Sequence, residues 1–143
     1  MIKYPITFQG SCDATPGIST SWETQATDTK LQCSVPVEFE GKGEFASPED
    51  YFLMAVMNCF VATFKVYALY SKLAFKDLQL TAALTVDKNI EGKPCMKSVE
   101  LLVNLTGVAT PERARLLVDK VLANGFILQS IKTELTIQLT FIE

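Results

Sequence analysis

The stretch SPEDYFLMAVMNCFVATFKVYALY, residues 47–70, decides how this chain folds. Its start carries the signals of a helix N-terminus: Ser47 suits the capping position, Pro48 suits the first helical position, and Asp50 completes a Ser-x-x-Asp box. From Tyr51 onward the side chains are apolar almost all round the helix. A helix that is apolar on every side belongs either to the centre of a core or to a membrane.

The length of this helix is just sufficient to cross a bilayer, so both alternatives have to be weighed. Asn58, Thr63 and Lys65 interrupt the apolar run, and a lysine inside a bilayer is strongly unfavourable. The segments on either side alternate apolar and polar residues, as expected of elements with one face in water. We therefore expect a long buried central helix and no membrane span.

The flanking segments alternate apolar and polar residues, which is the period of half-buried strands. Alternation from Ile2 to Phe8 predicts a first strand over residues 2–9, and GSCDATPG (10–17) predicts a turn. The further elements that we expect are strands over 18–27 and 31–37, a hairpin of strands over 77–88 and 99–106, a helix capped by Thr110 and ended by Gly125, and a last strand over 133–142.

The predicted order of elements is β-β-β-α-β-β-α-β, without a linker or a repeat. This order predicts one α+β domain over residues 1–143. Because a single chain of this size has little surface with which to cover an all-apolar helix, we expect a second copy to pack against it.

The composition excludes several kinds of function. The net charge is −3 and there is no histidine, so a His-based nucleophile pair and the commonest metal ligand are absent. Arginine occurs only at Arg113 and Arg115, and the absence of a basic run argues against nucleic-acid binding. We expect neither a metal site nor a cofactor.

Four widely spaced cysteines stand at Cys12, Cys33, Cys59 and Cys95, with no Cys-x-x-Cys pair. The N-terminal residues alternate and lack the charged start and apolar run of a signal peptide. Free thiols are therefore a better interpretation than a disulfide framework.

Residues 35–64 resemble the OsmC/Ohr family, whose members begin a long central helix with Pro-Glu and carry a cysteine ten positions after that Glu. Pro48, Glu49 and Cys59 have this spacing. The resemblance implies an intertwined cytoplasmic homodimer with a role in stress, in which the helix cysteine reduces organic hydroperoxides. It also implies a second cysteine that resolves the sulfenic acid as a disulfide, and an N-terminal arginine that holds the thiolate together with Glu49.

The chain departs from this pattern at two places. The segment 123–126, where the second cysteine is expected, reads Ala-Asn-Gly-Phe, and no arginine precedes Arg113. Two functions remain open. The first is a thiol peroxidase that uses Cys59 with an external thiol, and the second is a non-catalytic dimer that binds a small molecule in an apolar pocket around Cys59.

The candidate catalytic residues are Cys59 and Glu49. Cys59 is either a redox thiol or a small apolar residue of the core, which is how most free cysteines behave. Glu49 either cooperates with a cysteine or simply favours the positive end of the helix dipole. Ten residues of helix rise about 15 Å, so Glu49 can cooperate only with Cys59 of another copy.

Cys12 is the candidate resolving thiol, because it lies in the N-terminal region from which the family supplies its arginine. Asn58 and Thr63 are polar residues of an apolar helix and need partners if they are buried. Together with Phe52 they are the candidate pocket residues.

Overall fold

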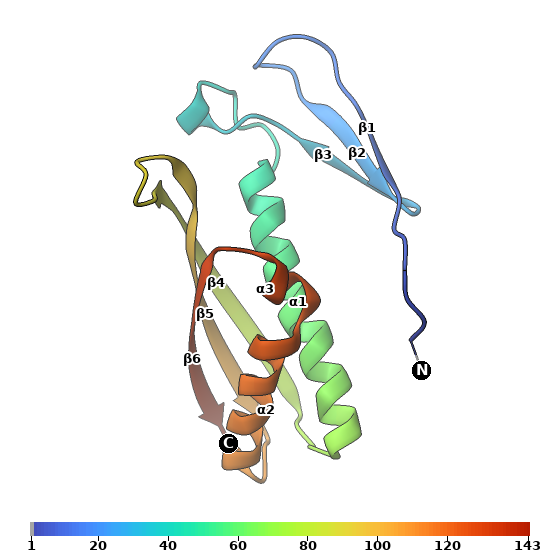
Figure 1. Ribbon diagram of the computed structural model, residues 1–143, viewed down its shortest axis with the longest axis vertical. Coiled ribbons are helices and arrows are strands. Elements are labelled where there is room, and N and C mark those ends of the chain that lie inside the picture. Colours follow the sequence, from blue (N-terminus) through green and yellow to red (C-terminus); the bar gives the residue numbers. More distant parts are fainter. Residues whose placement is uncertain (1) are drawn as a thin grey trace. The chain divides into compact units, whose positions relative to one another are not determined.

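The computed structural model describes residues 2–143, which form two compact units, the first ending at Tyr51 and the second spanning Phe52–Glu143. The elements are β1 (Gly10–Asp13), β2 (Trp22–Ala26), β3 (Thr29–Cys33), the 3-10 turn η1 (Val37–Phe39), α1 (Pro48–Ser71), β4 (Asp77–Lys88), β5 (Pro94–Thr106), α2 (Pro111–Asn124), α3 (Phe126–Ser130) and β6 (Glu134–Ile142) (Figure 1). Apart from the short η1 and α3, this order confirms the predicted α+β fold. The single domain stays a prediction.

The first unit contains an antiparallel sheet in the order β1-β2-β3, with Cys12 of β1 opposite Thr24 of β2. After β3 the chain folds into a turn that polar groups hold. The buried Ser34 hydroxyl donates to the Phe45 carbonyl and accepts from the Phe45 N–H, each at 3.0 Å. Cys33 is the only buried apolar side chain among the described residues of this unit, so hydrogen bonds take the place of a core.

Gly41 closes this turn by a very close approach of two backbone segments. A Cβ at Gly41 would lie 2.0 Å from the carbonyl oxygen of Val35, a distance that no side chain tolerates. The Gly41 N–H donates to the Pro36 carbonyl at 3.1 Å. Glycine is therefore a steric requirement at this position.

Two predictions for the N-terminal region are wrong. Residues 2–9 form no strand, and the alternating apolar side chains from Ile2 to Phe8 are all exposed, that of Phe8 by 87%. The strand is instead β1, inside the stretch 10–17 that was predicted to be a turn. β1 is fully exposed, so it has no apolar face that an alternating pattern could reveal, and it forms through backbone pairing with β2.

α1 begins as predicted, with a reciprocal cap. The Ser47 hydroxyl accepts from the Asp50 N–H at 3.1 Å, and the Asp50 carboxylate accepts from the Ser47 N–H at 2.8 Å. The residues that α1 buries recur at every fourth position and are Val56, Phe60, Phe64 and Ala68. This spacing defines one face of the helix.

The second unit packs its helices on one side of the sheet β4-β5-β6 (Figure 1). β4 and β5 pair antiparallel, whereas β5 and β6 pair parallel and are joined through α2 and α3. The centre of the core is made by alternate residues of β5 that are completely buried, namely Val99, Leu101, Val103 and Leu105. They belong to the same apolar cluster as the buried face of α1 and the buried residues of α2.

α2 has the predicted position, with Thr110, Pro111 and Glu112 at its start as expected. Thr110 stands at the capping position and makes no side-chain capping hydrogen bond, so the helix start depends on Pro111. Gly125 ends α2 as predicted, and its N–H donates to the Val121 carbonyl at 2.9 Å. The following α3 was missed, because five residues are too few for a helical period to be recognised.

The face of α1 opposite the buried one is largely apolar and exposed in the single chain, with Leu69 exposed by 75% and Tyr70 by 79%. Among residues 2–143, α1 is also the one helix whose length and composition would suit a membrane span, with 22% of its most apolar window buried. The buried face packs as in a core helix. The exposed face is an apolar patch that no residue of the second unit covers.

Candidate functional site

Cys59 lies in the middle of α1, is half-buried, and packs against the apolar core. Within residues 2–143 its one side-chain hydrogen-bonding partner is Thr63, a turn further along, whose Oγ1 is 4.0 Å from the sulfur. Lys65 of the same helix is exposed and makes no hydrogen bond to the sulfur. The environment of Cys59 is thus mainly apolar, with a single weak polar contact.

The junction between α2 and α3 approaches the sulfur of Cys59. A Cβ at Gly125 would lie 3.2 Å from Cys59 Sγ, and 2.9 and 3.0 Å from two side-chain carbons of Leu128. The family resemblance places a second cysteine in this segment, 123–126. Sequence reasoning therefore pointed to the segment, but it missed Gly125 and Leu128 as the groups that face the sulfur.

Glu49 stands in the first turn of α1 and is half-buried. Its Oε2 is buried and has no hydrogen-bond partner among the described residues. The position favours the positive end of the helix dipole, which does not replace a donor. Because α1 is one continuous helix, Glu49 is about 15 Å along the axis from Cys59, so the chain does not bring these two residues together.

The two cysteines of the first unit have different environments. Cys12 lies in β1 instead of a turn, is exposed, and has its Sγ 3.1 Å from Thr24 Oγ1. Cys33 is 4% exposed, and burial raises the pKa of its thiol. Hydrogen bonding from the Ser34 backbone partly opposes this rise of the pKa, while the negative charge of Glu49 adds to it.

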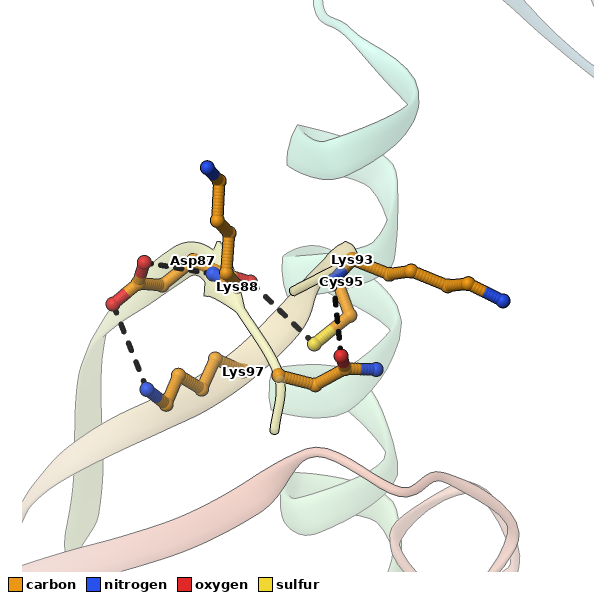
Figure 2. Close-up of polar contacts among 6 residues, drawn as sticks. Asp87, Lys88, Lys93, Cys95 and Lys97 are labelled. Atoms are coloured by element: carbon orange, nitrogen blue, oxygen red, sulfur yellow. Dashed lines mark hydrogen bonds and ion pairs between the residues drawn. The ribbon is translucent and has the colours of Figure 1, made fainter. Parts of the chain in front are cut away.

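Of the predicted pocket residues, Phe52 lines a cavity of about 790 Å³ at the end of the β4–β5 hairpin. Asn58 is exposed and Thr63 is half-buried beside Cys59, and neither lines that cavity. Cys95 does line it, and its thiol donates to the Asp87 carbonyl at 3.6 Å (Figure 2). Within residues 2–143 no three His, Cys, Asp or Glu side chains gather in a way that could hold a metal ion.

The family model described as OsmC-like protein matches residues 41–140. The fold is similar to that of an OsmC-like protein of unknown function from Vibrio cholerae, with a TM-score of 0.83 and 18% identity, over 94% of this chain and 99% of that one. It is also similar to an organic hydroperoxide resistance protein OsmC from Legionella pneumophila, with a TM-score of 0.76 and 22% identity, over 99% and 100% of the two chains.

An organic hydroperoxide resistance protein from Elizabethkingia anophelis, solved with thiocyanate bound, is similar at a TM-score of 0.76 and 20% identity, over 98% of each chain. No curated protein sequence matches the chain. At these identities the solved structures show a shared fold, whereas the family match covers well over half of the chain. It includes Glu49, Cys59 and the α2–α3 junction. The chain therefore belongs to the family of OsmC-like proteins.

Proposed function

We propose that this protein is a thiol-dependent peroxidase that acts on organic hydroperoxides in oxidative stress, in the cytoplasm, through Cys59. The observation that supports this most is the position of Cys59, the family's helix cysteine, whose half-buried sulfur faces the α2–α3 junction. A half-buried thiol can be reached by a small hydroperoxide, whereas a thiol enclosed in the core cannot.

The reaction needs only one thiol of the protein. The Cys59 thiolate attacks the outer oxygen of the hydroperoxide, the O–O bond breaks, and a proton completes the alcohol, so that the thiol becomes a sulfenic acid. An external thiol then forms a mixed disulfide and releases water. A second external thiol displaces the first one, which returns the Cys59 thiol and leaves the external reductant as a disulfide.

Because position 125 is glycine, the α2–α3 junction supplies no thiol that could resolve the sulfenic acid. A side chain at this position would start 3.2 Å from the sulfur, close enough for a thiol there to form a disulfide. With glycine the sulfenic acid faces backbone and the Leu128 side chain. We therefore place the external thiol at this junction.

The protein acts as a homodimer in this proposal. The exposed face of α1, with Leu69 and Tyr70, needs a cover, and a second copy supplies a self-complementary one. A second copy is also the means by which Glu49, with its unpartnered Oε2, approaches a Cys59. Light scattering after size exclusion tests this: Leu69→Lys should give monomers, and Leu102→Lys, on the other side of the sheet and 40% exposed, should not.

Cys12 is proposed as an alternative resolving thiol for Cys59 of another copy, because it is exposed and chemically free. Its contact with Thr24 does not block the sulfur. Treatment with peroxide followed by non-reducing peptide mapping should reveal a Cys12–Cys59 linkage that is absent from Cys12→Ser. If wild type and Cys12→Ser turn over equally and no linkage forms, only the external thiol resolves Cys59.

The decisive experiment measures turnover of cumene hydroperoxide and hydrogen peroxide with dithiothreitol as reductant. Wild type should be active and Cys59→Ser inactive, while Cys95→Ser, a matched thiol outside the site, should keep wild-type activity. Equal activity of wild type and Cys59→Ser, or none in either, would exclude the proposal. A further variant, Gly125→Cys with Leu128→Ala to make room, should form an internal disulfide with Cys59 on oxidation.

A second candidate function is a non-catalytic dimer that binds a small apolar molecule beside Cys59. It is favoured by the surroundings of the sulfur, where Thr63 at 4.0 Å is the one polar side-chain partner among residues 2–143. In this case peroxide turnover is absent from every variant. Cys59→Phe, which fills the space beside Gly125, should then abolish binding of an apolar fluorescent dye that wild type binds.

A further inference from the structure

The cavity at the end of the β4–β5 hairpin combines an apolar wall with basic residues. Its volume of about 790 Å³ lies within the range of small-molecule sites. The wall includes Phe52 of α1, Met96 of β5 and Ile131 after α3, and the lining also carries three lysines, Lys88, Lys97 and Lys132. A ligand with both an apolar and a charged part would match this lining.

The charges of the cavity are unbalanced. Glu134 is the only carboxylate among the lining residues, although the whole chain has a net charge of −3. Lys97 is already engaged by Asp87 at 3.6 Å, and Figure 2 shows Lys88 extending away from that pair. Neither Lys88 nor Lys132 forms an ion pair within residues 2–143. Two ammonium groups are therefore available to an anion.

The apolar part of the cavity lies against the core. Phe52 and Ile131 both pack against the apolar cluster of the second unit, so an apolar chain placed here would continue that packing. At the mouth, Ile90 of the hairpin turn is completely exposed. A ligand with an apolar chain would remove this side chain from water as well.

We propose that this cavity binds an amphipathic organic anion, a carboxylate on an apolar chain. The chain lies against Phe52, Met96 and Ile131, and the carboxylate is held by Lys88 and Lys132. The site is separate from the thiol site, because Cys59 does not line the cavity and stands seven residues, about 10 Å of helix rise, beyond Phe52. The proposal does not depend on peroxidase activity.

Calorimetric titration with decanoate, below the concentration at which it forms micelles, tests this on the intact protein. Decanoate should bind saturably. Decanol lacks the charge and should bind at least about tenfold more weakly, since a charged hydrogen bond contributes about 1.5–3 kcal/mol and each 1.4 kcal/mol is tenfold. Acetate lacks the apolar chain and should also bind at least about tenfold more weakly, because it cannot contact the apolar wall. Lys88→Gln with Lys132→Gln should weaken binding by a similar factor. Lys93→Gln is the matched control, because Lys93 is on the same hairpin, is paired with Glu91 at 3.9 Å and does not line the cavity.

The rate at which Cys95 is alkylated reports the position of the bound ligand. Decanoate should slow alkylation of Cys95 by iodoacetamide and leave the exposed Cys12 unaffected, and Cys59→Ser should bind decanoate as wild type does. Equal binding of decanol, equal weakening by Lys93→Gln, or unchanged Cys95 alkylation at saturating decanoate would overturn the proposal. Because Cys59→Ser removes the proposed peroxidase activity but not this site, failure of one proposal is distinguishable from failure of the other.

Discussion

The two units of the chain are held together by different interactions. In the second, β5, α1 and α2 contribute side chains to one common core. In the first, Cys33 is the only described apolar side chain that is buried, and a turn around Ser34 and Gly41 provides the fixed structure. An alternating sequence thus specifies an apolar face but not what covers it: residues 2–8 and 135–141 both alternate, and only the second stretch forms a strand covered by helices.

The largest expected effect is the difference in stability loss between a substitution in the core and one among the exposed N-terminal residues. Phe60→Ala removes a completely buried ring and should lower the free energy of unfolding by about 3–5 kcal/mol. Phe8→Ala, at a side chain exposed by 87%, should change it by less than about 0.5 kcal/mol. Denaturant unfolding measures both. A comparable loss in Phe8→Ala would mean that something covers residues 2–9 in solution, and the contrast between the units would disappear.

The second test compares two glycines. Gly41→Ala places a Cβ 2.0 Å from a backbone oxygen and should destabilise the first unit by more than about 2 kcal/mol. Gly92→Ala in the second unit has open space but a φ of +77°, so it should lose only about 1–2 kcal/mol from the left-handed conformation. Thermal unfolding followed by NMR, through the backbone amide signals of each unit, shows which unit is destabilised. Equal effects would indicate that the turn at Gly41 relaxes freely.

The third test compares the two helix starts. Ser47→Ala removes a reciprocal cap and should destabilise α1 by about 1 kcal/mol. Thr110→Ala should leave α2 almost unchanged, because the Thr110 side chain makes no capping bond. Hydrogen exchange of the first-turn amides distinguishes the helices. Faster exchange in α2 after Thr110→Ala would contradict the observed geometry.

The smallest effect concerns pH. Burial raises the pKa of Cys33 in the folded state, so the stability that the neutral thiol contributes is present below the unfolded-state pKa and is lost as pH rises through the folded-state pKa. Cys33→Ala should remove this alkaline loss of stability. At mildly alkaline pH, Cys33 should also react with iodoacetamide more slowly than the half-buried Cys95 of the second unit. Equal rates would show that Cys33 is accessible.

The sequence predicted those elements that carry a strong signal of their own. The cap at Ser47 and the long apolar run of α1, and the alternation of β4, β5 and β6, were sufficient. β1 could not be predicted, because a fully exposed strand has no apolar face and depends on its partner β2. The alternation of residues 2–9 suggested a strand, although no residue of the first unit covers its apolar face.

The candidate site was predictable in part. The spacing of Glu49 and Cys59 made both residues candidates through the family resemblance. The approach of Gly125 to the sulfur depends on how the end of α2 packs against α1, which no local pattern specifies. In the same way, the cavity beside Phe52 depends on where the β4–β5 hairpin ends in space, so its lysines had no recognisable spacing in the sequence.

The parallel pairing of β5 with β6 determines the order in which the strands of this sheet can pair during synthesis. β4 and β5 can pair as soon as their short turn has formed, whereas β6 reaches β5 only after α2 and α3 have been synthesised, because a parallel partner requires a crossover. Until then one edge of β5, flanked by the side chains that later fill the core, is open to other chains. While the ribosome proceeds from Thr106 to Ile142, the nascent chain therefore carries a half-built sheet with one edge exposed.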